Sequence, residues 1–213
     1  MERAICLAMG YVFGLFQTGY LYSKSKNMDI RNYGSGNAGS TNVLRVMGVK
    51  AGLIVFLGDA GKMILACLLT RVLFRGQPEM LYLYLLYTGL GVILGHNYPF
   101  YMGFKGGKGI AASAGLLFSL DWRMTLICFV VFVGTVAITR YVSLGSIFVM
   151  ILFMAGMSFF ACQGSYGLGQ AQLPEFCILA VIIGGLGIWR HHANIKRLLA
   201  GTENKLGSKK KKE

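Results

Sequence analysis

The chain has 213 residues, of which 55% are hydrophobic and 14% are charged. Because a soluble domain carries about 25% charged residues, this composition excludes an ordinary water-soluble enzyme and indicates an integral membrane protein. The formal net charge is +13, but the basic residues lie in short loops and a tail between apolar segments. We therefore expect no nucleic-acid partner, since a nucleic-acid binder groups its cations on one water-facing surface.

Seven apolar segments of roughly helical length follow one another along the chain. They cover residues 4–22, 51–74, 79–98, 109–120, 122–139, 143–162 and 174–189. A membrane-crossing helix needs about 20 residues, so the fourth segment is short enough to be a half-helix or a re-entrant piece. The pattern predicts an all-α polytopic membrane protein with seven transmembrane helices, one of them short or re-entrant. Taking 109–139 as one helix, with one other segment not spanning, would give five spans instead.

The ends of the chain carry two further expectations. The first segment has no small-residue cleavage site after it, so we expect an uncleaved span rather than a signal peptide. Residues 1–200 are expected to form a single transmembrane domain, and residues 201–213 a basic cytoplasmic tail. The run Lys209–Lys212 would be solvated, or would touch anionic lipid head groups.

The lysines and arginines are divided unequally between the two sides of such a bundle. With seven crossings, sixteen of the 21 fall on the side of the long loops and the C-terminus, and four on the other side. The excess of positive charge predicts an N-terminus outside and a C-terminus in the cytoplasm. The remaining cation, Lys62, lies with Asp59 inside the second segment at a spacing of i, i+3. The pair could be an interior ion pair or part of a site.

The loop before the second span is rich in hydrogen-bond donors. Between Gly34 and Arg45 it holds three glycines, two serines, a threonine, two asparagines and an arginine. These groups suit a phosphate, and the candidate ligands are Ser35, Gly36, Asn37, Thr41, Asn42 and Arg45. The glycines also match G-x-G-x-x-G, but no strand precedes them, so a dinucleotide-binding unit is excluded.

A second glycine-rich stretch runs from His96 to Ser113. Glycine backbone N–H groups and mobile lysines favour an anion, and the candidates are Lys105, Gly106, Gly107 and Lys108. It is no Walker A loop, because Met102 stands where the first glycine should be and Gly109 follows Lys108. Pro99 should end one helix, and a helix starting at Gly109 would direct its N-terminus at the anion.

Two shorter polar stretches complete the set. Ser143 lies at a turn between two spans, where its spacing favours a helix cap, with a ligand role as the alternative. His191 and Asn194 share one face of a basic extension after the last span. Few acids accompany these groups, so we expect neither a metal site nor a paired-carboxylate mechanism. The five separated cysteines are expected to be buried free thiols, and the alternative is a pair between Cys162 and Cys177, which flank one loop.

Together these motifs resemble the bacterial acyl-phosphate:glycerol-3-phosphate acyltransferases, the PlsY family. The resemblance rests on Ser35-Gly-Asn-Ala-Gly-Ser-Thr-Asn-Val-Leu-Arg45, Gly95-His-Asn-Tyr-Pro99, Phe104-Lys-Gly-Gly-Lys-Gly109, Ser143-Leu-Gly-Ser-Ile147 and His191 through Glu203. The motifs occur in order over essentially the whole chain. Ser40, Ser113 and His192 depart from the family's common residues.

The resemblance implies an enzyme of the bacterial plasma membrane with its site on the cytoplasmic side. It would pass the acyl group of acyl phosphate to the 1-hydroxyl of glycerol 3-phosphate, without a cofactor. His191, Asn194 and Ser143 would form the catalytic group, with His191 and Asn194 holding glycerol 3-phosphate. Lys105 would contact phosphate, with Lys108 as a supporting cation. The hydroxyl proton could go to His191 or to a substrate phosphate. A transporter or channel for phosphate-type anions and a scaffold for lipid enzymes are the alternatives.

Overall fold

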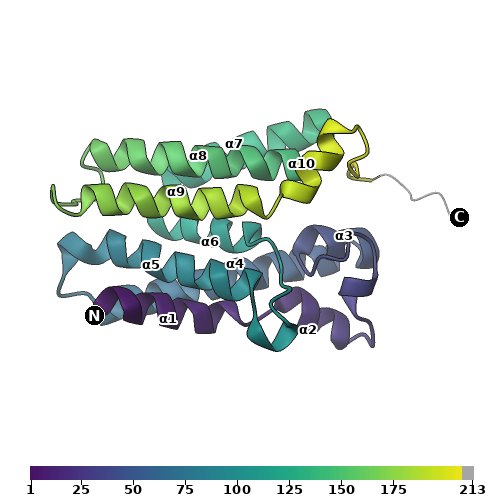
Figure 1. Cartoon of the computed structure of the whole chain (residues 1–213), viewed down its shortest axis with the longest axis horizontal. Helices are drawn as coiled ribbons and strands as arrows, with labels where there is room; N and C mark the ends of the chain where they lie inside the picture. The colour runs from purple at the N-terminus through teal and green to yellow at the C-terminus, as the bar shows by residue number, and fades with distance from the viewer. Residues whose placement is uncertain (208–213) are drawn as a thin grey trace, which may run out of the picture.

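The computed structural model describes residues 1–207, and within this range the chain is helical and contains no strand. The longer helices run side by side along the long axis of the molecule (Figure 1). Their bounds are α1 Glu2–Gly14, α2 Thr18–Lys24, η1 Ile30–Asn32, α3 Ser40–Met47, α4 Val49–Leu73, α5 Pro78–Asn97, η2 Phe100–Met102, α6 Ile110–Leu120, α7 Trp122–Thr139, α8 Val142–Cys162, α9 Leu173–Trp189 and α10 His192–Leu199. The predicted all-α fold class is confirmed.

Each of the seven predicted apolar segments is helical, but their lengths differ. In the described part of the chain, five segments are long and apolar enough to cross a membrane, and six are if α9 and α10 count as one bent span. The short fourth segment is α6, with 11 residues. α6 and α7 are separate helices, because Asp121 is extended and its carboxylate accepts hydrogen bonds from the backbone N–H groups of Arg123 and Met124. The reading of 109–139 as one helix was therefore wrong.

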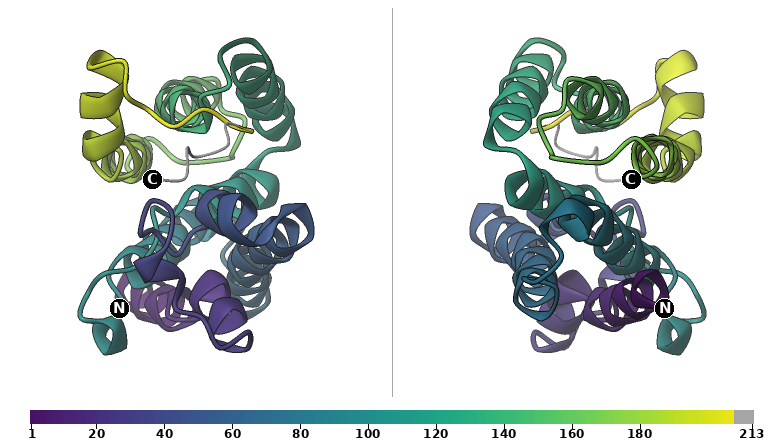
Figure 2. Two further views of the ribbon diagram at one scale, coloured as in Figure 1. Left: turned by 90° about the vertical axis from the view of Figure 1, so that its right-hand side faces the viewer. Right: turned by 90° about the vertical axis from the view of Figure 1, so that its left-hand side faces the viewer.

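The helices form two groups that meet at α6. Views along the long axis place α1, α2, α4 and α5 on one side and α7, α8 and α9 on the other (Figure 2). α6 packs against α4, α5 and α7. The core that the two groups of helices share includes Met63, Leu86, Leu116, Met150 and Phe153, all fully buried.

Glycines bring α1 and α5 unusually close together. A Cβ atom on Gly10 would lie 2.2 Å from the carbonyl oxygen of Thr88, and one on Gly95 would lie 2.2 Å from that of Tyr11. Gly14 and Gly91 are equally tight. Small residues four apart allow such close backbone contact between membrane helices. The contact places the end of α1 directly beside the end of α5.

The outer faces of the bundle are apolar. On α7, Trp122, Phe129, Val130 and Ile138 are all more than half exposed. An exposed apolar surface of this extent is typical of helices that face lipid. The N-terminus lies at one end of the bundle, whereas α3 and α10 lie at the other, which we name the polar end (Figure 1).

Two local features were not predicted. The first apolar segment is broken between α1 and α2, at residues 15–17. The loop expected over residues 23–50 contains α3, whose run Ser-Thr-Asn-Val-Leu-Arg looks like a polar loop by composition. Helix α10 confirms the predicted basic helical extension. Lys209–Lys212, named above as a possible lipid contact, lie outside the described residues.

Candidate active site

A cavity of about 430 Å³ opens at the polar end, between the two groups of helices. One part of its wall is polar and is formed by Ser35, Asn37, Thr41, Asn42, Arg45, Asp59, His96, Lys108, Ser143, His191, Asn194, Arg197 and Glu203. The other part is apolar and is formed by Leu44, Leu53, Phe56, Ile110, Phe132, Val136 and Val142. The cavity can therefore hold a charged group at one end and a hydrocarbon chain at the other.

The buried side chain of Asn42, on α3, holds the first glycine loop in shape. Its Nδ2 donates to the carbonyl oxygens of Tyr33 (2.9 Å) and Asn37 (3.0 Å), and its Oδ1 accepts from the backbone N–H of Ser35 (2.8 Å). Gly34 adopts a left-handed conformation (φ +62°), and a Cβ atom there would lie 2.2 Å from Asn42 Oδ1. The amide of Asn42 is thus occupied by the loop itself, which makes it a support rather than a free ligand.

Three cations line the cavity, and one of them, Arg197, is paired with Glu203. Arg45, in the last turn of α3, has no hydrogen bond or ion pair from its side chain within residues 1–207. Lys108 donates to Oδ1 of Asn194. Burial lowers the pKa of Lys108 to about 8, with the positive charges of Arg197, Arg190 and Arg45 acting in the same direction and Glu203 opposing them. Lys108 therefore carries a proton at neutral pH but holds it weakly.

His191 is positioned at the turn between α9 and α10. Its Nδ1 lies 2.8 Å from the carbonyl oxygen of Gly187, so Nδ1 carries the proton in this contact and Nε2 is left as an acceptor. Burial and the charge of Lys108 lower the pKa of His191 to about 4. The imidazole is therefore neutral at pH 7.

A carboxylate that the sequence did not single out joins three site residues. Glu203 accepts hydrogen bonds from Asn194 Nδ2 (2.7 Å) and Arg197 Nε (2.7 Å). It also accepts from Ser143 Oγ (3.0 Å), and Ser143 makes no side-chain cap at the start of α8, so the cap interpretation was wrong. Burial raises the pKa of Glu203, but these three hydrogen bonds outweigh it and leave the pKa below its ordinary value. The available signal was its position at the end of the stretch from His191 to Glu203, nine residues after Asn194.

The structure separates the two lysines of the glycine stretch. Lys105 does not line the main cavity; it lines a second cavity of about 470 Å³, together with Arg31, Arg190 and Gly106. Ser35 and Asn37 form a wall shared by both cavities. Lys108 therefore lines the same cavity as His191 and Asn194. Lys105, which the resemblance made the expected phosphate contact, lines the other cavity. Among residues 1–207, no group of three or more metal-ligating side chains occurs.

Comparison with known proteins shows which family this chain resembles. A sequence model described as glycerol-3-phosphate acyltransferase matches residues 4–201. The chain is 39% identical over 210 residues to the glycerol-3-phosphate acyltransferase of Thermoanaerobacter sp. (strain X514), covering 98% of each chain. It is 41% identical over 209 residues to that of Clostridioides difficile (strain 630), covering 97% of this chain and 96% of the relative.

Two solved structures are also similar. The crystal structure of PlsY, an integral membrane glycerol 3-phosphate acyltransferase, in its glycerol 3-phosphate form has a TM-score of 0.82 and 37% identity, covering 97% of this chain and 96% of that one. The form described as that of lysophosphatidic acid has a TM-score of 0.80 and 36% identity over the same shares. The chain belongs to the glycerol-3-phosphate acyltransferase family of integral membrane proteins, the PlsY family.

Proposed function

We propose that this protein transfers the acyl group of acyl phosphate to the 1-hydroxyl of glycerol 3-phosphate, giving lysophosphatidic acid and inorganic phosphate. The observation that carries the proposal is the main cavity, which joins the cations Arg45 and Lys108 to an apolar wall of α3, α4, α6, α7 and α8 residues. The relatives' names supply the acceptor substrate. The cations Arg45 and Lys108 in this cavity support acyl phosphate as donor, because they suit a phosphate group beside the acyl chain.

Both substrate phosphates would lie against the polar part of the cavity wall, and the acyl chain against the apolar part. Lys108, His191 and Asn194 would hold glycerol 3-phosphate, and Arg45 with the loop from Ser35 to Thr41 would hold the phosphate of the donor. The acyl chain would follow the apolar wall past Phe56 and Phe132 towards lipid. Acyl phosphate is already activated, so the protein contributes by orientation and by charge stabilisation, and orientation can lower a barrier by about 7–11 kcal/mol.

In the reaction, the 1-hydroxyl oxygen attacks the acyl carbonyl carbon and forms the ester bond. The bond from that carbon to the phosphate oxygen breaks, and phosphate leaves with the electron pair. The hydroxyl proton goes to a substrate phosphate, whose second pKa is about 6, rather than to His191, whose pKa of about 4 makes it the weaker base. The single proton of the 1-hydroxyl is then directed at the phosphate, and His191 Nε2 would orient glycerol 3-phosphate by accepting a hydrogen bond from its 2-hydroxyl.

The unequal distribution of charge supports a cytoplasmic site in the bacterial plasma membrane. At the end away from the cavity, Arg3 is paired with Glu175 (2.6 Å) and Arg123 with Asp121 (2.7 Å). The surplus of cations lies at the polar end, in the loops and in α10. Positive loops face the cytoplasm in such proteins.

The proposal is tested with the detergent-purified protein, glycerol 3-phosphate and either palmitoyl phosphate or palmitoyl-CoA. With palmitoyl phosphate as donor, we expect lysophosphatidic acid and phosphate in equal amounts. With palmitoyl-CoA as donor, we expect no product. Lys108→Gln and Arg45→Gln should abolish most of the rate, whereas Lys50→Gln, an exposed lysine outside the cavity, should not. Turnover without a sealed compartment would exclude a transporter, and turnover only with palmitoyl-CoA would contradict the proposed donor.

A further inference from the structure

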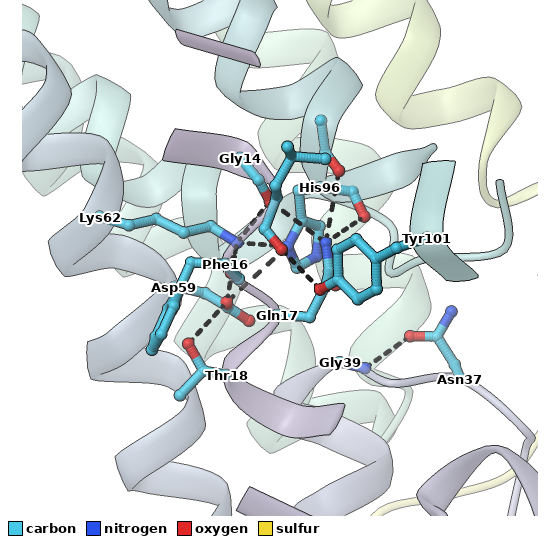
Figure 3. Close-up of polar contacts among 12 residues, drawn as sticks. Gly14, Phe16, Gln17, Thr18, Asn37, Gly39, Asp59, Lys62, His96 and Tyr101 are labelled. Atoms are coloured by element: carbon cyan, nitrogen blue, oxygen red, sulfur yellow. Dashed lines mark hydrogen bonds and ion pairs between the residues drawn. The ribbon is translucent and has the colours of Figure 1, made fainter. Parts of the chain in front are cut away.

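A buried polar cluster lies at the break between α1 and α2 (Figure 3), and two of its members, Asp59 and His96, also line the main cavity. Its charged members, Asp59 and Lys62, are 1% and 5% exposed, and His96 is 3% exposed. Gln17 and Thr18 complete the cluster. Buried charges are costly unless they are paired and hydrogen-bonded, so a cluster with this many bonds has a specific geometry to maintain.

The ammonium group of Lys62 is the centre of the cluster. Its Nζ lies 2.6 Å from the carbonyl oxygen of Phe16, 3.3 Å from that of Gly14, 2.8 Å from Nδ1 of His96 and 3.1 Å from Oδ1 of Asp59. The two carbonyl groups are left without helical partners because α1 ends at Gly14. A cation at a helix C-terminus satisfies such groups. Lys62 therefore ties the end of α1 to α4 and α5.

Gln17 and Thr18 secure the other side of the break. Gln17 Nε2 donates to the carbonyl oxygens of Gly14 (3.2 Å) and His96 (3.0 Å). Thr18 Oγ1 donates to Asp59 Oδ1 (3.0 Å). Hydrogen bonds thus hold both the backbone and the ring of His96, and both come from residues far away in the sequence.

The imidazole of His96 also contacts the backbone of the glycine loop. Because Nδ1 accepts from the Lys62 ammonium, the ring proton lies on Nε2. A Cβ atom on Gly107 would lie 2.1 Å from that Nε2, so the loop backbone rests directly on the ring. Gly107 N–H also donates to the His96 carbonyl (3.1 Å), and Gly106 N–H donates to that of Asn97 (3.1 Å).

The same loop reaches the active site one residue later. Lys108 follows Gly107 and donates to Asn194 inside the main cavity. From the opposite side, Arg190 Nη2 donates to the carbonyl oxygens of Gly106 (3.2 Å) and Gly107 (2.8 Å). The loop is therefore clamped between His96 and Arg190, and its direction determines where Lys108 points.

We propose that Lys62 and His96 are positioning residues: the ammonium orients the imidazole, and the imidazole supports Gly107 so that Lys108 meets the substrate phosphate. Neither side chain is required to touch substrate. The inference rests on the proposed function, because it takes Lys108 as a ligand of glycerol 3-phosphate. It adds a role for the charged pair within the second span.

The test compares two substitutions of His96. In His96→Asn, Oδ1 can replace Nδ1 as the acceptor for Lys62, whereas His96→Leu keeps similar bulk but has no acceptor. Because a displacement of about 1 Å can cost about 100-fold, we expect His96→Leu to lower kcat/KM for glycerol 3-phosphate by about tenfold or more. His96→Asn should stay within about threefold of the parent, since the acceptor is retained.

A second readout separates positioning from mere stability. Lys108 faces Glu203, Arg45, Arg190 and Arg197 in its buried place. A displaced loop would give Lys108 more water, so His96→Leu should move the alkaline limb of kcat/KM from about pH 8 towards the ordinary lysine value of 10.5. His96→Asn should leave that limb in place. A purely structural residue would change the amount of folded protein and not the position of the limb.

Gly107→Ala covers the case in which His96→Leu does not fold. It pushes the loop away from the ring without altering the buried charges, and Gly61→Ala is the control, because a Cβ there meets nothing within 4 Å. We expect Gly107→Ala to weaken glycerol 3-phosphate binding by about tenfold in calorimetry, a readout that needs no acyl donor. Equal kinetics for His96→Asn and His96→Leu, or unchanged binding in Gly107→Ala, would overturn the positioning role. Absence of turnover in the parent protein would instead refute the proposed function.

Discussion

The side-chain hydroxyl of Ser143, at the start of α8, donates a hydrogen bond of 3.0 Å to Oε1 of Glu203, which follows α10. The same oxygen accepts from Asn194, so one carboxylate joins two candidate catalytic residues from separate helices. The chain after α10 also returns to the end of α7, where Leu206 N–H donates to the Arg140 carbonyl (2.7 Å). This C-terminal segment closes one side of the cavity.

Replacing Glu203 by Gln should therefore destabilise the site. The amide has one oxygen to accept from three donors, and hydrogen bonds to charged groups contribute about 1.5–3 kcal/mol each. We expect a lower unfolding midpoint in detergent and a rate reduced by at least about tenfold, because Asn194 loses its orientation. Glu2→Gln removes only an exposed pair with the N-terminus and serves as control. An unchanged midpoint in Glu203→Gln would contradict this role.

Lys108 should produce an alkaline limit to activity. Its pKa of about 8 means that the free protein loses this positive charge as the pH rises through 8. Since kcat/KM reports the free enzyme, kcat/KM for glycerol 3-phosphate should fall about tenfold per pH unit above that value. Lys108→Arg keeps its charge at every accessible pH. Its kcat/KM should be lower but independent of pH in this range, and a limb retained in Lys108→Arg would assign it to another group.

The sequence predicted the helices better than their breaks and contacts. The spans could be predicted because each is a long apolar run, and Pro99 and Gly109 correctly marked the end of α5 and the start of α6. Helix α3 could not, since its polar residues also suit a loop. Lys105 and Lys108 line different cavities, and the backbone beside them is left-handed at Phe104 (φ +60°) and Gly109 (φ +82°), neither of which spacing shows.

Long-range contacts account for the rest. Asp59 and Lys62 could be paired from their i, i+3 spacing, and the structure confirms the ion pair at 3.1 Å. The third partner, His96, lies 34 residues after Lys62, on α5, and reaches it because α5 packs against α4. Glu203 likewise meets Ser143 across 60 residues.

His191 should orient substrate rather than remove its proton. At a pKa of about 4 its imidazole is neutral throughout the range in which the protein would be assayed. In His191→Gln, the amide can still form a hydrogen bond with the substrate hydroxyl. We expect a measurable rate, about 10- to 100-fold below the parent, with an acid limb near the substrate phosphate pKa of about 6. Complete loss of rate with intact glycerol 3-phosphate binding would assign the proton to His191.

The two asparagines of the first loop should respond differently to the same substitution. Asn42→Asp replaces by an acceptor the Nδ2 group that donates to the carbonyl oxygens of Tyr33 and Asn37. The Tyr33 carbonyl still accepts from Gly36 N–H, but the Asn37 carbonyl is left unsatisfied. Each unsatisfied buried group costs about 1–3 kcal/mol, so the unfolding midpoint should fall clearly.

Asn37→Asp keeps the side-chain oxygen that accepts from Gly39 N–H (2.8 Å), so the loop should retain its stability. The new negative charge would lie on the wall shared by both cavities and repel a phosphate. We expect a raised KM for at least one substrate with an unchanged unfolding midpoint. Thermal unfolding in detergent, measured with the kinetics of both variants, separates loop support from substrate contact. Equal midpoints for Asn42→Asp and the parent would show that Asn42 does not support the loop.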